Sequence, residues 1–166
     1  MKVARRLFAQ ADRFNVSSLA SLDSSIVGSP KVALLFPGQG SQFVGMAADI
    51  YKFKSAKRVL DECEAVLGEK LTTVMFEGPR ALLTSTANAQ PAILAHSIAI
   101  LRVLESEFGF DITKCTYALG HSLGEYSALV ATRSLTLADA IRLVRLRGTA
   151  MQNAISDKST AMVMHS

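Results

Sequence analysis

The stretch GHSLGEYSAL, residues 120–129, decides the fold. It follows CTYAL at 115–119, a short run with β-branched and aromatic residues, and it leads into a run of helical character. Its first five residues fit G-x-S-x-G, the nucleophile elbow, in which a serine lies on a sharp turn between a strand and a helix. Neighbouring side chains would collide with so tight a turn, hence the glycine on both sides. We therefore predict that Ser122 projects at the carboxyl edge of a sheet.

This predicted position favours chemistry at Ser122. The N-terminus of the following helix offers free backbone N–H groups and a helix dipole, which together stabilise an oxyanion. A serine placed there can act as a nucleophile and carry an acyl group as an ester. The five-residue pattern alone occurs by chance, and its placement between a strand and a helix makes it specific.

Other apolar patterns predict a parallel α/β sheet. The run KVALLF at 31–36 is stopped by Pro37 and Gly38, which is typical of a strand buried on both faces. Mixed helical character runs from about Met46 to Leu67 and is closed by Gly68. Strand, helix, strand, helix in this order indicates the α/β class.

Two further helices are predicted on either side of the second strand. One spans 91–108, with Pro91 in its first turn and Gly109 as its stop. The other follows Thr136, which forms a capping box with Asp139. We expect one broad apolar side on this last helix, made by Ile141, Leu143, Val144 and Leu146.

Composition narrows the classes of function. The chain has 166 residues, 49% hydrophobic and 19% charged, which suits one globular domain. The net charge of +4 comes without a basic stripe interleaved with aromatics, so we expect no nucleic-acid binding. No apolar run approaches the roughly 20 residues of a membrane span. Cys63, Cys115 and three scattered histidines match no metal or disulfide spacing, so no metal site is predicted.

The first thirty residues have the composition of an organellar transit peptide. Lys2, Arg6 and Arg13 fall near one helical face, and six serines follow. A segment rich in Arg and Ser, poor in acidic residues and amphipathic is typical of mitochondrial import. We expect cleavage before Lys31 and a location in the mitochondrial matrix. If residues 1–30 are an ordinary tail instead, the expected location is cytoplasmic.

Four motifs together resemble those of malonyl-CoA:acyl carrier protein transacylases and related acyltransferase domains. They are FPGQGSQFVGM at 36–46, QPAIL at 90–94, GHSLGEYSAL at 120–129 and RLVRLRGTAMQ at 142–152, in the family's order. The resemblance implies the N-terminal part of an α/β-hydrolase-like parallel-sheet domain over 31–155. Residues 156–166 would then enter a ferredoxin-like small subdomain, at whose start the chain is cut.

The resemblance also implies a reaction in fatty-acid synthesis. Malonyl would pass from coenzyme A to a Ser122 ester and then to the phosphopantetheine thiol of acyl carrier protein. Malonyl-CoA and phosphopantetheinylated acyl carrier protein would be the substrates, with no further cofactor. A full-length member is expected to be a monomer that acts away from membranes and nucleic acids.

Individual roles carry over onto five other positions of this sequence. The resemblance places the oxyanion hole at the backbone N–H groups of Leu123 and Gln39. It makes Arg147 the clamp for the free carboxylate of malonyl, a contact worth on the order of 1.5–3 kcal/mol. Gln90 would line the same pocket. His121 is adjacent to the nucleophile, yet residues next to an elbow point in different directions, so we expect it to line the pocket rather than act as the base.

Two alternatives remain open. Family members are longer, and none of the three histidines here stands at the position of the base that activates the serine. We therefore expect little activity and weak stability from this chain alone, and a non-catalytic module that binds coenzyme A or acyl carrier protein is one alternative. The other is a serine esterase or thioesterase of the α/β-hydrolase type. Arg147 speaks against a neutral-acyl esterase, because a buried guanidinium facing an apolar acyl chain is costly.

Overall fold

The structure is a computed structural model that describes residues 32–154. The predicted transit peptide at 1–30 and the predicted subdomain entry at 156–166 lie outside these residues. The elements in chain order are β1 (Ala33–Phe36), α2 (Lys54–Leu67), α3 (Leu71–Glu77), α4 (Arg80–Thr84), α5 (Thr86–Phe108), a 3-10 helix (Ile112–Lys114), β2 (Tyr117–Gly120), α6 (Gly124–Ala131) and α7 (Leu137–Asn153).

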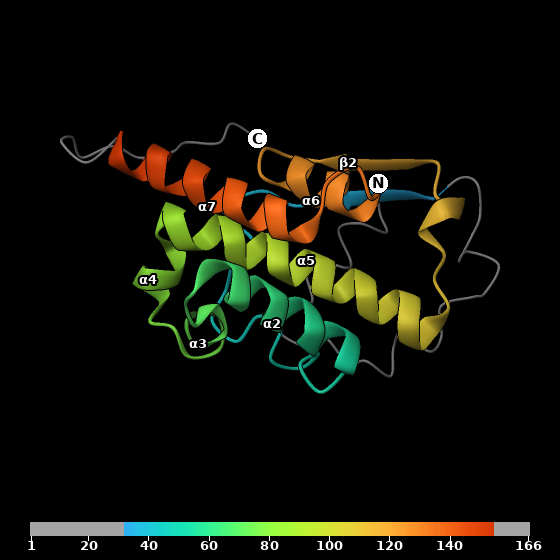
Figure 1. Ribbon diagram of the computed structural model, residues 1–166, viewed down its shortest axis with the longest axis horizontal. Coiled ribbons are helices and arrows are strands. Elements are labelled where there is room, and N and C mark those ends of the chain that lie inside the picture. Colours follow the sequence, from blue (N-terminus) through green and yellow to red (C-terminus); the bar gives the residue numbers. More distant parts are fainter. Residues whose placement is uncertain (1–31, 155–166) are drawn as a thin grey trace.

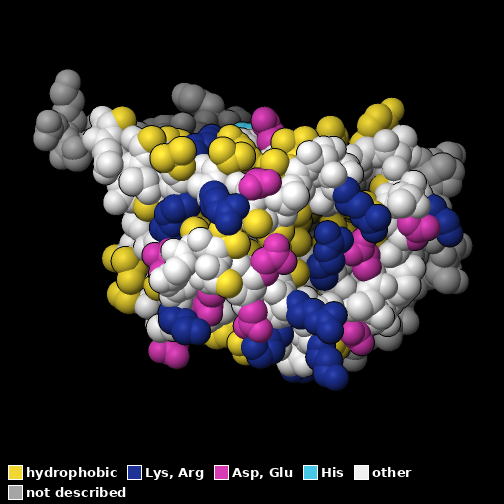
Figure 2. Space-filling view, in the orientation of Figure 1, with side chains coloured by type: hydrophobic (Ala, Val, Ile, Leu, Met, Phe, Trp, Pro, Cys, Tyr) yellow, Lys and Arg dark blue, Asp and Glu magenta, His cyan; other side chains and the backbone are white. Residues whose placement is uncertain are grey.

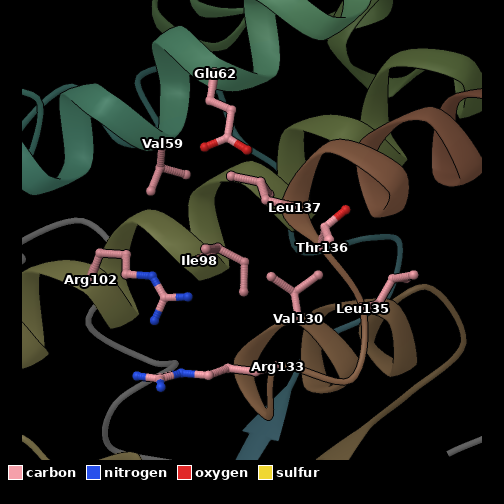
Figure 3. Close-up of a pocket in the computed structure, with 9 residues that line it drawn as sticks. All are labelled: Val59, Glu62, Ile98, Arg102, Val130, Arg133, Leu135, Thr136 and Leu137. Carbon is pink, nitrogen blue, oxygen red and sulfur yellow. The ribbon is translucent and has the colours of Figure 1, made fainter.

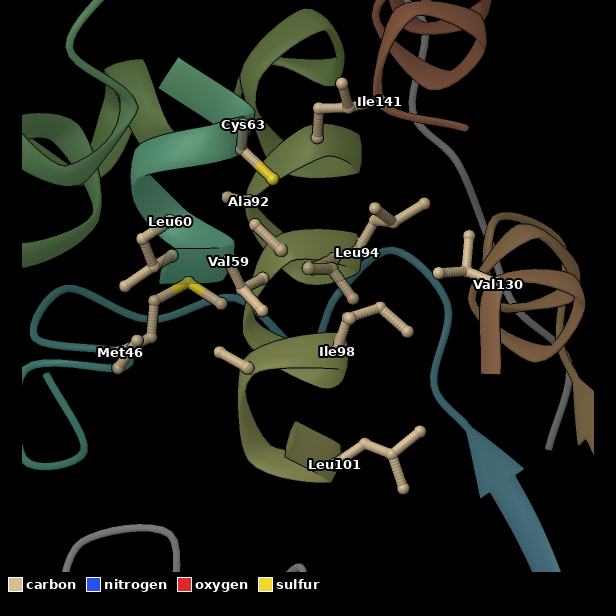
Figure 4. Packing of buried hydrophobic residues seen from close by; sticks show 14 of the residues in the cluster. Met46, Val59, Leu60, Cys63, Ala92, Leu94, Ile98, Leu101, Val130 and Ile141 are labelled. Atoms are coloured by element: carbon tan, nitrogen blue, oxygen red, sulfur yellow. The ribbon is translucent and has the colours of Figure 1, made fainter. Parts of the chain in front are cut away.

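Helix α5 is the centre of the fold. It packs against α7 on one side and α2 on the other, and it also contacts α6, which covers the two strands (Figure 1). Its middle supplies Leu94 and Ile98 to the core, where they meet side chains from α2, α6 and α7 (Figure 4). Cys63 of α2 is buried in this cluster, and burial raises the pKa of its thiol to about 12.

The two strands are parallel, as predicted, and β1 pairs with β2 so that Leu35 lies beside Leu119. The prediction of burial on both faces is wrong for the described residues. Leu34 and Ala118 face the helices, whereas Leu35, Leu119 and Tyr117 are 58%, 53% and 62% exposed. Covered and exposed side chains alternate along each strand, because the helices of residues 32–154 cover only one face of this two-stranded sheet.

The predicted element boundaries shift at three places. Turns occupy 44–52 and α2 begins at Lys54, because Ala47 adopts φ 68°, which a right-handed helix does not allow. Helix α5 begins five residues before Pro91, since the preceding TANAQ contains no glycine or proline. Strand β2 begins at Tyr117 and not at Cys115 as predicted, because the N–H of Cys115 forms the hydrogen bond that closes the 3-10 helix.

Helix α7 begins as predicted and buries a narrower stripe than predicted. Thr136 Oγ1 accepts a hydrogen bond of 3.1 Å from the Asp139 N–H, so the expected cap is present. Ile141 and Val144 are buried, but Leu143 and Leu146 are 43% and 68% exposed. Hydrophobic side chains accordingly gather along the α7 edge in Figure 2, whereas charged side chains of both signs are mixed over the rest of that face.

His96 is a partly buried titratable residue of α5. Its ring makes an edge-to-face contact with Phe43, with centroids 6.1 Å apart. Burial lowers the pKa of His96 from 6.5 to about 4, and the carboxylate of Asp49 offsets only part of this effect. This environment indicates a packing role for His96.

The lowered pKa of His96 predicts a pH-dependent stability. Between about pH 6.5 and 4 the unfolded chain binds a proton at His96 that the folded chain does not, so the free energy of unfolding decreases as the pH falls. The contribution is at most about 1.4 kcal/mol per pH unit. Urea denaturation at about pH 7.5 and about pH 5 measures it, with His96→Gln as the non-titrating control. An unchanged pH dependence in His96→Gln would contradict the assignment.

Candidate active site

Ser122 lies on the predicted strand–turn–helix. Strand β2 ends at Gly120, α6 begins at Gly124, and the exposed Ser122 lies between them with φ 55°. The N–H of His121 bonds to the Phe36 carbonyl at 3.1 Å and ties the turn to β1. A positive φ is uncommon for a residue with a side chain, and it marks a locally strained backbone.

The two elbow glycines occupy positions where no side chain fits. A Cβ at Gly120 would lie 2.0 Å from the carbonyl of Gly124, and a Cβ at Gly124 would lie 2.3 Å from the carbonyl oxygen of Phe36. Backbone atoms are the obstacle in both cases, so no rotamer change could relieve the overlap. The expected reason for glycine on both sides of Ser122 is therefore confirmed.

Three predicted site residues, from α5, α7 and the turn before α6, meet at one point. Arg147 Nη2 donates to Ser122 Oγ at 2.9 Å, and Arg147 Nη1 donates to Gln90 Oε1 at 2.7 Å. Gln90 is fully buried on α5, and its Nε2 lies 3.4 Å from Met151 Sδ. Gln90 thus fixes one side of the guanidinium while the other side reaches the serine.

Arg147 differs from the other two arginines of α7 in its charge partners. Arg142 pairs with Asp139, and Arg145 pairs with Glu69. Within residues 32–154 no acidic side chain forms a salt bridge with Arg147. The charge next to Ser122 is therefore available to an anionic ligand.

The two predicted oxyanion donors flank the elbow. Leu123 is buried at the N-cap of α6, and Gln39 lies in the loop after β1, where its Nε2 donates to Thr86 Oγ1 at 3.3 Å. The backbone N–H groups of Leu123 and Gln39 have no acceptor among the described residues. This loop reaches the elbow closely, since a Cβ at Gly38 would lie 2.8 Å from His121 Nδ1.

His121 lies beside the glycine-rich loop and is exposed. Over residues 32–154 its ring makes no hydrogen bond to Ser122 Oγ, which accepts one from Arg147. The role of His121 in lining a pocket stays a prediction, and within residues 32–154 no histidine bonds to Ser122 Oγ.

Sequence reasoning missed the contacts of Thr86 and Met151 with the site. The sulfur of Met151 contacts the Gln90 amide. Thr86 begins α5 five residues before Pro91, which had suggested a later start. The sequence carries no pattern that would have indicated either contact.

A hollow of about 310 Å³ lies away from the elbow, between α2, α5, the end of α6 and the start of α7. Its wall combines apolar residues such as Ile98 and Val130 with the guanidinium groups of Arg102 and Arg133 (Figure 3). It contains none of the predicted site residues. Within the described part of the chain no cluster of three His, Cys, Asp or Glu side chains could hold a metal, and no helix is long and apolar enough to cross a membrane.

Comparison with known proteins identifies the family. The acyl transferase domain family matches residues 33–165. The chain belongs to this family. It is 48% identical over 134 residues to a malonyl CoA-acyl carrier protein transacylase of Bacillus subtilis strain 168, covering 80% of this chain and 41% of that acyltransferase. It is 44% identical over 131 residues to a Drosophila melanogaster protein described as "Probable malonyl-CoA-acyl carrier protein transacylase, mitochondrial", covering 79% and 35%.

Solved acyltransferase structures share the fold. An acyl-carrier-protein-S-malonyltransferase from Bartonella henselae aligns with a TM-score of 0.70 at 49% identity, covering 74% of this chain and 40% of the other. A malonyl-transacylase solved in complex with a type II PKS acyl-carrier protein aligns with a TM-score of 0.69 at 44% identity, covering 75% and 40%. The α/β class is confirmed. The chain spans about two fifths of the length of the curated relatives it matches.

The elbow geometry predicts a steep cost for a methyl group at Gly124. Gly124→Ala should lower the free energy of unfolding by about 3 kcal/mol, because β1 or α6 must move away to admit the Cβ. Gly68→Ala is the matched control, since its Cβ would meet no atom within 4 Å and only the φ of 69° opposes it, at about 1 kcal/mol. Equal losses in urea denaturation would show that the close approach is not what fixes glycine at 124.

Proposed function

We propose that this chain carries the nucleophile and the carboxylate clamp of a malonyl-CoA:acyl carrier protein transacylase of fatty-acid synthesis. One observation carries the proposal: the guanidinium of Arg147 lies 2.9 Å from Ser122 Oγ and has no acidic partner within residues 32–154. A fixed cation beside a nucleophilic serine selects an acyl group that bears its own negative charge. Malonyl, in which one CH2 group separates a free carboxylate from the thioester carbonyl, is an acyl group of this kind.

In the first half-reaction Ser122 Oγ attacks the thioester carbon of malonyl-CoA. The Oγ proton goes to a base, the C–S bond breaks, and coenzyme A leaves as a thiolate that takes up a proton. The carboxylate of malonyl accepts hydrogen bonds from the guanidinium of Arg147. The guanidinium then no longer donates to Ser122 Oγ. Gln90 keeps its hydrogen bond to Nη1 and so holds the fork in place.

The charge that develops on the thioester oxygen faces the N-terminus of α6. The N–H groups of Leu123 and Gln39, which have no acceptor within residues 32–154, are placed to stabilise it. Losing one such donor costs about 10²- to 10³-fold in rate in a serine hydrolase of known mechanism. His121 lines the same edge next to Gly38.

The second half-reaction returns the malonyl group to a thiol. The phosphopantetheine thiolate of acyl carrier protein attacks the Ser122 ester, the C–O bond breaks, and Ser122 Oγ regains a proton. The malonyl-transacylase solved with its acyl-carrier protein supports this choice of partner. Both thiols belong to substrates, so the proposed cycle needs no resident cofactor or metal.

A second candidate function follows from the proton that Ser122 must lose. Within residues 32–154 no histidine or carboxylate accepts a hydrogen bond from Ser122 Oγ. The chain on its own would then bind coenzyme A esters or acyl carrier protein while turning them over slowly. An esterase is less well supported, because the unpaired Arg147 would face a neutral acyl chain at a cost.

Loading with malonyl tests the proposed function. Arg147→Met should slow malonylation of Ser122 by malonyl-CoA about 10- to 150-fold, the value of an Arg–carboxylate pair, and should change acetylation by acetyl-CoA little. Intact mass in a single-turnover time course measures both reactions. Ser122→Ala should abolish both, and Arg142→Met, an exposed arginine of the same helix, should alter neither. Equal slowing of the two acyl groups in Arg147→Met would rule out the carboxylate clamp.

We further propose import into the mitochondrial matrix, with residues 1–30 as the transit peptide and a monomeric mature protein. The Arg- and Ser-rich composition supports this location, as does the similarity to the Drosophila protein described as mitochondrial. A fluorescent reporter fused to residues 1–30 should enter mitochondria, whereas the same fusion with Arg5, Arg6 and Arg13 changed to Glu should stay outside. A diffuse cytosolic signal from the unaltered fusion would contradict the proposal.

A further inference from the structure

Helix α5 contains an acceptor that the helix itself cannot satisfy. Pro91 lies inside α5 and has no N–H, so the carbonyl of Ala87, four residues earlier, lacks its intrahelical hydrogen bond. A backbone carbonyl without a partner is costly in a packed region. The carbonyl of the half-buried Ala87 is therefore open to a donor from elsewhere in the fold.

Helix α7 supplies that donor through Arg145. Arg145 Nη1 donates to the Ala87 carbonyl at 2.6 Å and to Asn88 Oδ1 at 2.8 Å, while Nη2 pairs with Glu69. Further along α7, Gln152 Oε1 accepts a hydrogen bond of 3.1 Å from the Ala87 N–H. Both backbone groups of one residue in α5 are thus bonded by side chains of α7.

These contacts between α5 and α7 lie on both sides of the pair formed by Arg147 and Gln90. Arg147 lies between Arg145 and Gln152 on α7, and its partner Gln90 lies between Ala87 and Pro91 on α5. The helices also approach closely here, since a Cβ at Gly148 would lie 2.6 Å from the Thr86 carbonyl oxygen. The register of α7 on α5 at this point therefore sets where the Arg147 guanidinium stands relative to Ser122.

We propose that Arg145 is a positioning residue: by replacing the hydrogen bond that Pro91 removes, it fixes the register of α7 on α5 and so the place of the Arg147 fork beside Ser122. The inference rests on the proposed function and goes beyond it, because Arg145 touches neither substrate nor Ser122. Bidentate recognition of a carboxylate depends on orientation, and a displacement of about 1 Å in such a site can cost about 10²-fold. A lysine could not replace Arg145, because a single ammonium lacks the planar fork that reaches Ala87, Asn88 and Glu69 together.

The pairing with Pro91 is tested by a double-mutant cycle. Arg145→Met in the otherwise unaltered chain should raise the unfolding equilibrium constant about tenfold, because the Ala87 carbonyl loses its donor. In a Pro91→Ala background the new N–H of residue 91 can bond to Ala87, so the same substitution should cost severalfold less. Equal costs in the two backgrounds would overturn the link between Arg145 and the proline.

The positioning role is tested by binding, using malonyl-CoA and acetyl-CoA as the two probes in calorimetry. Arg145→Met should weaken malonyl-CoA binding about fivefold more than acetyl-CoA binding, because the misplaced Arg147 meets only the malonyl carboxylate. Arg142→Met, which removes an exposed arginine of the same helix, should leave the ratio unchanged. Arg145→Lys should resemble Arg145→Met rather than restore the ratio. Loss of both ligands in equal measure would indicate a merely structural residue and overturn the proposal.

The same measurement separates this inference from the proposed function. If Arg147→Met leaves the preference for malonyl-CoA intact, the clamp itself is wrong and the proposed function fails. If Arg147→Met removes the preference and Arg145→Met does not, the clamp stands and only the positioning role is rejected.

Discussion

The contact between the backbone of α6 and the end of β1 is the constraint on which the site depends. Gly124 approaches the Phe36 carbonyl so closely that a methyl group has no place, and the His121 N–H is bonded to the same carbonyl. This contact holds the start of α6 over the sheet edge, where the Leu123 N–H has no acceptor among residues 32–154. It also brings the loop that carries Gln39 against the elbow. The nucleophile and both proposed oxyanion donors are thus placed by one backbone approach.

A second constraint places the charge. Arg147 comes from α7, which does not touch the elbow through its backbone at this point, so its guanidinium reaches Ser122 only if α7 is held firmly on α5. Buried Gln90 holds the guanidinium directly, and the bonds from Arg145 and Gln152 to Ala87 hold the helix. In the proposed anion site the arginine is held without an acidic neighbour from residues 32–154, so its charge stays available to the ligand.

Local patterns were sufficient for the elbow and insufficient for the helix packing. G-x-S-x-G between a strand and a helix predicts the turn at Ser122 because its steric requirements are local. The pattern of α7 did not reveal that Leu143 and Leu146 stay exposed, since that depends on which neighbours reach them. Likewise Pro91 usually marks a helix start, and here a side chain distant in sequence satisfies the carbonyl it leaves free. Contacts between residues distant in sequence produce no periodic pattern from which they could be predicted.

The backbone at Ser122 has a consequence for how the chain tolerates change. With φ at 55°, the residue occupies a region that glycine enters freely and that costs serine about 1 kcal/mol or more. Stability and chemistry therefore make opposite demands at this position. A population of sequences selected only for folding would drift toward glycine there, and the nucleophile persists only while its reaction is under selection. The proposed reaction, and not the stability of the turn, therefore accounts for a serine at this position.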